Sequence, residues 1–255
     1  AEFDQVLMPT PAAVLEGVRL LADGCAGVSG LGSLLVVDPG GATTDVHSVA
    51  SGEPSVAGVI PQGLPEPRLK RTVEGDLGMR HNAAAIVEAV GLERFAADAR
   101  LAPSRALALL GQIGRDVERL PQSAEETALD QALARASVKI AVARHCGSVE
   151  TVFTAAGPVT VQHGKDLSNV GAVIGTGGAL VHSRDARAVL EMALANVAEP
   201  LSLRPKQPKL LLDREYLLYA CGLLGAVEPQ AALELALAHL EPIDTENLHA
   251  QTLGA

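Results

Sequence analysis

The sequence predicts an α/β fold, and three observations lead to that prediction. The run Leu34-Leu35-Val36-Val37 reads as a short, fully buried strand, and residues 46–50 fit the start of a second strand after a glycine turn. A further apolar run, residues 173–181, passes through glycines into a helix-like stretch. Between residues 75 and 145 the apolar spacing becomes that of amphipathic helices.

The turn between the first two strands has the composition of a phosphate-binding loop. It reads Asp38-Pro39-Gly40-Gly41-Ala42-Thr43-Thr44-Asp45, which places glycines and carboxylates at the mouth of an apolar strand. Glycine admits positive φ and lets backbone N–H groups approach phosphate oxygens, and carboxylates suit a hydrated Mg²⁺. A Walker A loop or a Rossmann fingerprint would open a helix, and neither pattern occurs here. An ordinary hairpin turn with acids nearby is the alternative.

These eight residues closely resemble the second phosphate motif of the actin, heat-shock chaperone ATPase and sugar-kinase superfamily, D-x-G-G-x-T-x-D. That superfamily also has a glycine-rich adenosine motif downstream, and Val173-Ile174-Gly175-Thr176-Gly177-Gly178 is similar to it. Taken alone, the second turn would fit any strand-to-helix connection. The resemblance implies an RNase H-like (actin-like ATPase) lobe, with a mixed sheet flanked by helices and a helical insertion.

The resemblance also implies roles for residues of the phosphate turn. Asp38 would hold Mg²⁺ through water, and Gly40 and Gly41 would approach the β- and γ-phosphates of ATP. Thr43 would bond a γ-phosphate oxygen or the attacking water, and Asp45 would orient that water or accept its proton. Because phosphoryl transfer relies mostly on positioning and charge neutralisation, such a small polar cluster is sufficient.

The second turn would lie against the adenosine of ATP or ADP through Gly175, Thr176, Gly177 and Gly178. Thr44 is expected to face away from Thr43 and Asp45, because neighbouring residues of a strand point to opposite faces. Its alternative to a site role is simple strand packing.

Beyond the superfamily, the block from Lys70 to Arg80 resembles a signature of the glutamate mutase reactivase family, also called GlmL or MutL and unrelated to the mismatch-repair protein of similar name. Further similar blocks cover nearly the whole chain, at residues 8–13, 38–49, 163–167, 174–178 and 213–224. The family resemblance implies a chaperone-like ATPase that expels damaged cobalamin from an adenosylcobalamin-dependent mutase or aminomutase, so that intact coenzyme can replace it.

The family's first phosphate motif, a D-x-G-S/T-x-x-T/S-K segment, has no counterpart in this sequence. We therefore expect the chain to be the carboxy-terminal half of the family protein, inactive alone, with the missing amino-terminal lobe and the mutase as partners. Loss of the ATPase is the alternative. Two other functions stay open: a small-molecule kinase of the same superfamily, and a non-catalytic module that docks through residues 75–123. Homo-oligomerisation also stays open.

Composition narrows the class of protein. The chain has 255 residues, 48% of them hydrophobic, and can bury a sizeable core. Its formal charge of −10 and its 2% of aromatic residues argue against nucleic-acid binding. Three separated cysteines without C-x-x-C spacing predict reduced thiols, and no leader peptide or membrane-length apolar run is evident. We expect a cytoplasmic protein that does not contact membranes.

The expected organisation is an ATPase lobe of residues 1–74 and 124–255, interrupted by a helical insertion of residues 75–123. Helices are expected at residues 12–21, 79–90, 92–99, 104–118, 124–145, 185–198, 214–224 and 230–240. Strands outside the two glycine motifs are expected at residues 6–8, 55–60, 150–162 and 209–212.

Several charged residues have two readings. Glu74 and Asp76 would contact the ribose or relay cleft closure, or else cap a helix start. Lys70 and Arg71 would reach phosphate or adenine, although adjacent bases more often mark a solvated face. The pair Lys165-Asp166 fits a turn with a surface ion pair. Structural or surface roles are expected for four scattered histidines, His47, His81, His145 and His163.

Overall fold

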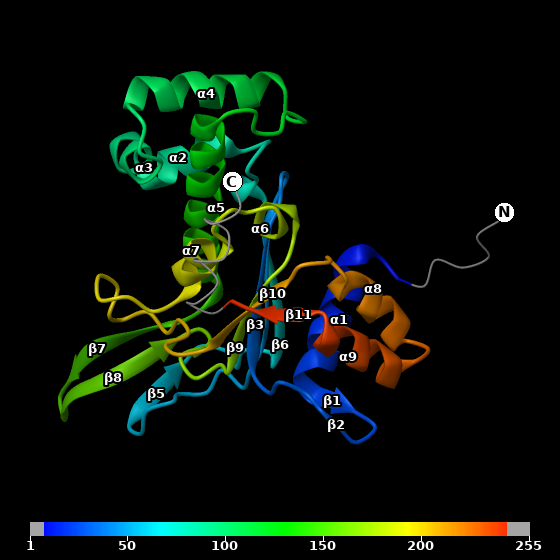
Figure 1. Ribbon diagram of the computed structural model, residues 1–255. Coiled ribbons are helices and arrows are strands. Elements are labelled where there is room, and N and C mark those ends of the chain that lie inside the picture. The colour runs from blue at the N-terminus through cyan, green and yellow to red at the C-terminus, as the bar shows by residue number, and fades with distance from the viewer. Residues whose placement is uncertain (1–7, 244–255) are drawn as a thin grey trace.

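The computed structural model describes residues 8–243 and contains one central mixed sheet of six strands (Figure 1). Along the sheet the order is β11-β10-β9-β3-β4-β6. Strand β3 is antiparallel to β4 and parallel to β9, β4 is antiparallel to β6, and β10 is parallel to β9 and antiparallel to β11. The strands are β3 (Leu34–Pro39), β4 (Thr44–Val49), β6 (Leu69–Glu74), β9 (Ala172–Gly175), β10 (Lys209–Asp213) and β11 (Leu240–Pro242).

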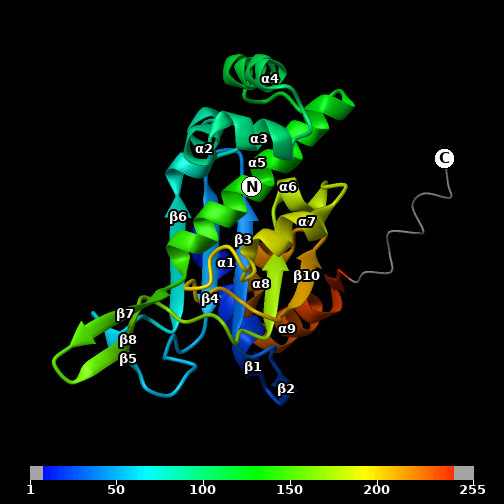
Figure 2. The ribbon, with the colours of Figure 1, turned by 90° about the vertical axis from the view of Figure 1, so that its left-hand side faces the viewer.

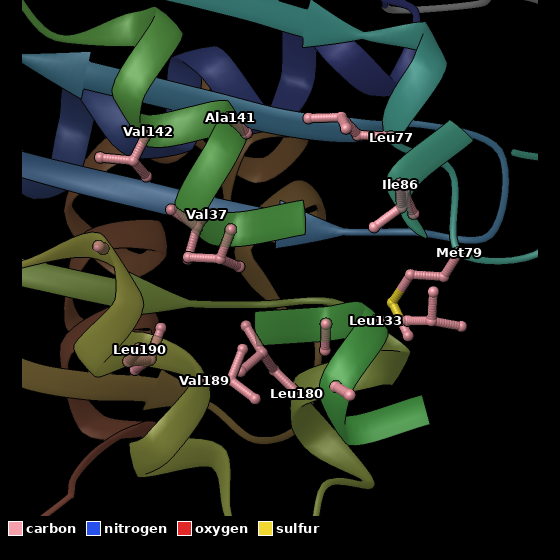
Figure 3. Packing of buried hydrophobic residues seen from close by; sticks show 14 of the residues in the cluster. Val37, Leu77, Met79, Ile86, Leu133, Ala141, Val142, Leu180, Val189 and Leu190 are labelled. Carbon is pink, nitrogen blue, oxygen red and sulfur yellow. The ribbon is translucent and has the colours of Figure 1, made fainter. Parts of the chain in front are cut away.

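Helices cover both faces of this sheet, which is why Leu34, Leu35, Val36 and Val37 all have no exposed surface. Leu34 and Val36 belong to the cluster that includes residues of α1 (Thr10–Asp23), α8 (Leu218–Gly225) and α9 (Pro229–Ala238). Leu35 and Val37 point to the opposite face, into the cluster of α5 (Ala124–His145), α6 (Gly178–Val181) and α7 (Ala186–Leu190). Figure 2 shows α5 crossing its face of the sheet, and Figure 3 shows Val37 among side chains of that cluster. The predicted α/β class, with a mixed sheet flanked by helices, is confirmed.

Three helices lie between β6 and α5 in the chain, and they gather over one end of α5 (Figures 1 and 2). They are α2 (Ala83–Val90), α3 (Leu92–Asp98) and α4 (Pro103–Arg115), preceded by the 3₁₀ turn η1 (Gly75–Leu77). Their buried side chains, such as Ile86, Phe95 and Leu109, continue the cluster of the α5 face. The helical character of the segment is confirmed, while its division from the lobe as a subdomain stays a prediction.

Two smaller sheets lie outside the central one. One is the ribbon of β1 (Gly24–Cys25) and β2 (Val28–Ser29), and the other has the order β5-β8-β7. Strand β5 (Val59–Gln62) begins four residues later than expected. The predicted single stretch 150–162 is wrong in one respect, because it is a hairpin of β7 (Ser148–Thr154) and β8 (Gly157–His163). Pro158 lies inside β8 opposite Phe153, and the turn between the two strands is at residues 155–156.

Some predicted helix boundaries are wrong, for tertiary reasons. The helix expected from residue 79 begins at Ala83, after a segment in which Met79, Arg80 and His81 donate their N–H groups to the phosphate turn. The helix expected over 185–198 is only α7 followed by the 3₁₀ turn η2 (Glu191–Ala193). The long helix expected over 124–145 is confirmed as α5, with the Ser123 hydroxyl accepting the Glu126 N–H at its start.

The first strand expected, residues 6–8, lies mostly outside the described residues. Among the helices of residues 8–243, none combines the length and the apolar content needed to cross a bilayer.

Candidate functional site

The phosphate turn joins β3 to β4 and is closed by a Gly40 N–H to Thr43 carbonyl hydrogen bond of 2.8 Å. Antiparallel register places Asp38 opposite Asp45, so both side chains lie on one face of the hairpin. Neither Gly40 nor Gly41 has positive φ, which corrects one of the reasons given for glycine here. Close approach is the reason at Gly40, where a Cβ atom would lie 2.9 Å from the Thr43 carbonyl oxygen.

The segment Gly78 to His81 holds the turn from outside. Met79 donates its N–H to the Gly40 carbonyl at 3.0 Å, and Arg80 and His81 donate to the Gly41 carbonyl at 2.9 and 3.1 Å. A Cβ atom at Gly78 would lie 2.2 Å from the Ala42 carbonyl oxygen, so only glycine allows this contact. The carbonyl groups of Gly40, Gly41 and Thr43 are thereby engaged, while the N–H groups of Gly41 and Ala42 donate to no acceptor among residues 8–243.

The side chains of the turn divide as the strand alternation predicts. Thr44 is fully buried and donates to the Leu77 carbonyl at 2.8 Å, which is a packing role. Thr43 donates to one carboxylate oxygen of Asp45 at 2.9 Å, and Arg71 donates to the other at 2.8 and 3.1 Å. The interpretation of Arg71 as part of a solvated face is therefore wrong, since β6 pairs with β4 and brings its guanidinium onto Asp45.

The second glycine turn lies beside the first because β3 and β9 are parallel neighbours, with Val37 opposite Gly175. Thr176 donates its N–H to the Val37 carbonyl at 3.0 Å. Gly177 has a φ of +88°, and a Cβ atom there would lie 2.0 Å from Asp38 Oδ1. Gly178 begins α6, with open space around its own Cβ position. The structure thus brings together the two motifs that are about 140 residues apart in the chain.

A third carboxylate, Asp213, completes the polar cluster and was not predicted. It ends β10, so it reaches the same edge of the sheet as the glycine turn after the parallel strand β9. Asp213 accepts the Thr176 hydroxyl at 2.9 Å and the N–H groups of Leu217 and Leu218 at 2.9 and 3.0 Å. The sequence carries a signal for this residue, because Asp213 directly follows the apolar run 210–212. That run forms β10, which runs parallel to β9, the strand before the second glycine turn.

Burial, and next the charges of Asp45 and Asp213, raise the pKa of Asp38 from 3.8 to about 6. The Asp38 carboxylate accepts no hydrogen bond from residues 8–243 that would offset this repulsion. The charge of Asp38 in turn is the first cause that raises the pKa of Tyr216. A divalent cation would relieve the crowding of three acids, so the donor chemistry fits Mg²⁺.

Direct coordination by several side chains does not fit. In the described part of the chain, no three His, Cys, Asp or Glu side chains are grouped closely enough to ligate one metal ion. A hydrated ion held mainly through water is the form that these residues would bind.

A cleft of about 590 Å³ opens on the α5 side of the phosphate turn. This volume lies within the range of small-molecule sites, about 300–1,000 Å³. Its lining comes from the phosphate turn and its clamp (Pro39, Gly40, Gly41, Ala42, Met79, Arg80 and His81), the α4–α5 loop and α5 (Val117, Glu118, Leu120, Pro121, Thr127, Asp130 and Gln131), and the region of α6 (Gly178, Ala179, His182, Ser183 and Arg184). Of the predicted site residues, Gly40, Gly41 and Gly178 line the cleft, whereas Asp38, Thr43, Asp45 and the rest of the second turn lie beyond it.

Arg80 sets one wall of the cleft through a two-pronged ion pair with Asp130 of α5, in which Nη1 lies 2.9 Å from Oδ1. Glu74 and Asp76 lie outside the lining, and both pair with Arg144, at 2.6 and 2.8 Å. Of the two readings for these acids, the helix cap is not formed by Glu74, whose side chain makes no cap bond at the start of η1.

Lys165 and Asp166 do not form the expected surface ion pair. Lys165 is fully buried, donates to the carbonyls of Pro67 and Arg68 at 2.8 Å, and has its pKa lowered to about 8, chiefly by burial. Asp166 accepts the N–H groups of Ser55 and Ser168. Both side chains therefore fasten loops around the β5-β8-β7 sheet.

Lys70 and the histidines have structural contacts. Lys70 pairs with Glu66 at 2.9 Å and donates to the His145 carbonyl. His145 is buried between Thr72 and Ser48, and burial lowers its pKa to about 3. Of the other three histidines, His47 is buried, His81 lines the cleft, and His163 pairs with Glu150.

Three antiparallel strands followed by two strands parallel to the first, with glycine turns at their shared edge, define an RNase H-like lobe of the actin-like kind. A model of the MutL protein family matches residues 1–240. The chain belongs to this family, which confirms the resemblance to the glutamate mutase reactivases. Protein MutL of Clostridium tetanomorphum is 43% identical over 238 residues, which are 92% of this chain and 51% of that protein. The chain thus spans about half the length of the curated relative that it matches.

Asp38 offers a test by pH. For an acid with a raised folded-state pKa, the folded protein binds more protons than the unfolded chain between the two pKa values, so the free energy of unfolding falls as pH rises from about 4 to about 6. Asp38→Asn removes this loss, and we expect it to stabilise the chain at pH 7 by roughly 1–3 kcal/mol. Urea unfolding at pH 4, 5, 6 and 7 measures it. The gain should vanish near pH 4, and a gain that does not change with pH would contradict the assignment.

Proposed function

We propose that the chain is the carboxy-terminal, nucleotide-binding half of an ATP-dependent chaperone that reactivates an adenosylcobalamin-dependent mutase of the glutamate mutase type. One observation carries the nucleotide part: parallel pairing of β3 with β9 sets the Asp38 carboxylate against Gly177, directly beside the 590 Å³ cleft. Membership of the MutL family supports the mutase part.

In this proposal the base and ribose of ATP or ADP enter the cleft between α5 and α6. The phosphates would then pass over the turn, where the N–H groups of Gly41 and Ala42 have no acceptor among residues 8–243 and would donate to phosphate oxygens. Asp38 lies beyond the turn and would hold a hydrated Mg²⁺. When bound, Mg²⁺ would neutralise phosphate charge during transfer.

Thr43 and Asp45 would act on the terminal phosphate and the attacking water. Their mutual hydrogen bond and the Arg71 ion pair fix the Asp45 carboxylate, so its orientation is set before a ligand arrives. Asp213 acts as a positioning residue, because its bond to Thr176 and its cap on α8 hold the second turn.

The same geometry explains why we expect this half to be inactive alone. The carboxylates of Asp38 and Asp45 lie outside the lining of the cleft. A water-excluding enclosure strengthens the electrostatic stabilisation of phosphoryl transfer. The remaining part of the longer family protein would supply it.

The reactivation test uses the intact protein that contains this chain, an inactivated mutase, ATP, Mg²⁺ and fresh adenosylcobalamin. We expect mutase turnover to return with the parent protein and to fall at least tenfold with Asp38→Asn, while Asp98→Asn, at an exposed residue paired with Arg135, acts like the parent. Failure of the parent to restore turnover would sink the mutase assignment. ATP-dependent phosphorylation of a small molecule instead would identify a kinase.

A further inference from the structure

The β7–β8 hairpin projects away from the central sheet, and β7 forms the outer edge of its small sheet (Figures 1 and 2). Every residue of β7 except Val149 is exposed, and Phe153 is 83% exposed. The segment Ser-Val-Glu-Thr-Val-Phe-Thr is rich in β-branched and aromatic residues and has one charge. Such an open edge is a template for pairing with another strand.

The free part of this edge has fixed limits. Val149 donates its N–H to the Leu201 carbonyl at 2.9 Å, on the side of β7 away from β8. The loop at Leu201 therefore covers the edge up to Val149, and the turn after Thr154 ends it at the other end. On the side away from β8, residues 150–154 have no neighbouring strand among the described residues.

The Val149 bond also tells which backbone groups point outward. Alternate residues of a strand direct their N–H and C=O groups to opposite edges, so Thr151 and Phe153 share the outward direction of Val149. Glu150, Val152 and Thr154 direct theirs toward β8. The free edge thus offers two donors and two acceptors.

These limits suit a second copy of the same edge. If two copies of residues 150–154 pair antiparallel, the two-fold axis passes through Val152, and Thr151 of each copy lies opposite Phe153 of the other. All outward donors and acceptors then meet in two hydrogen-bonded pairs. Glu150 lies opposite Thr154, so no like charges oppose each other, and Phe153 gains a cross-strand neighbour.

We propose that two copies of this chain associate through their β7 edges, residues 150–154, around a two-fold axis at Val152, forming a continuous six-stranded sheet. The two copies are equivalent, as in a closed isologous dimer. Five residue pairs bury less area than the 1,200 Å² or more typical of stable interfaces, so association is weak and depends on protein concentration.

Disulfide formation tests the proposal on the full 255-residue chain with Cys25→Ser, because Cys146 and Cys221 are buried. In the proposed dimer the two copies of Val152 form a non-hydrogen-bonded pair. The Cα atoms of such a pair are about 4.5 Å apart, which is within disulfide range. We expect Val152→Cys to form a covalent dimer under mild oxidation. In the Glu150→Cys variant the thiols of the two copies would lie about four residues apart along the paired strands, and the same holds for Thr154→Cys. Each of these variants should therefore form no covalent dimer.

A second measurement keeps the proposal testable without cysteine chemistry. Thr151→Pro removes an outward donor and no bond to β8, and should weaken self-association at least tenfold by sedimentation equilibrium. Thr160→Val, at a half-buried residue of the central strand β8, lies in the same sheet away from the edge and should leave association unchanged. Equal cross-linking at residues 150, 152 and 154, or a parent chain that stays monomeric up to millimolar concentration, overturns the proposal and favours a partner of another kind at this edge.

Discussion

Replacing Gly177 by valine is expected to abolish binding of Mg-ADP and to destabilise the fold. A φ of +88° is strained for any branched side chain, at roughly 1–3 kcal/mol, and the new Cβ would lie 2.0 Å from Asp38 Oδ1. Either the turn moves away from β3 or the Asp38 carboxylate is displaced, and both separate the two glycine motifs. Calorimetric titration with Mg-ADP and urea unfolding measure the two effects.

Gly178→Ala is the matched control for stability. Apart from its chain neighbours, no described residue has an atom within 4 Å of the Gly178 Cβ position, and its φ is not positive, although it adjoins Gly177 in the same turn. We expect its free energy of unfolding to stay within about 0.5 kcal/mol of the parent. Parent-like stability and affinity in Gly177→Val would show that contact between the turns is not required for the site.

The predictable parts of the molecule are those that local sequence determines. Leu34 to Val37 read as a strand buried on both faces, and the D-x-G-G turn after it indicated a hairpin, whose register in the structure sets Asp38 opposite Asp45. The α5 helix was predictable from a serine cap at one end and Gly147 just past the other.

The parts that escaped prediction depend on which strands become neighbours. Arg71 reads as a surface base until β6 pairs with β4 and sets it against Asp45. Asp213 joins the site only because β10 lies parallel to β9. Lys165 has the composition of a surface turn, yet two carbonyl groups from a loop nearly 100 residues away bury its ammonium group. Periodicity carries none of this information, since it describes one element at a time.

The segment before α2 bears on function. The N–H groups of Met79, Arg80 and His81 bind the carbonyls of Gly40 and Gly41, so these two carbonyls of the phosphate turn are occupied. What remains for a ligand is the N–H side, which is the side an anion requires.

The second large effect is expected at Gly222, where α8 crosses α1 on the opposite face of the sheet. A Cβ atom there would lie 1.7 Å from the Ala13 carbonyl oxygen, and one at the facing Gly17 would lie 2.5 Å from the Leu218 carbonyl oxygen. The two helices therefore touch backbone to backbone. Gly222→Ala should lower the free energy of unfolding by about 3 kcal/mol, at the upper end of overpacking effects.

Gly114→Ala in α4 is the same change at a helix position whose Cβ would meet no described residue outside its own helix within 4 Å. It should stabilise the chain by roughly 0.5–1 kcal/mol because glycine is a poor helix former. Opposite signs for the two substitutions, measured by urea unfolding with unchanged m-values, would isolate the helix contact as the cause. Since Asp213 caps α8, a helix pushed away from α1 also pulls on the acid that holds Thr176. Gly222→Ala should therefore weaken Mg-ADP binding from the far side of the sheet, whereas a variant that loses stability and keeps full affinity would show that the site is held by β9 and β10 alone.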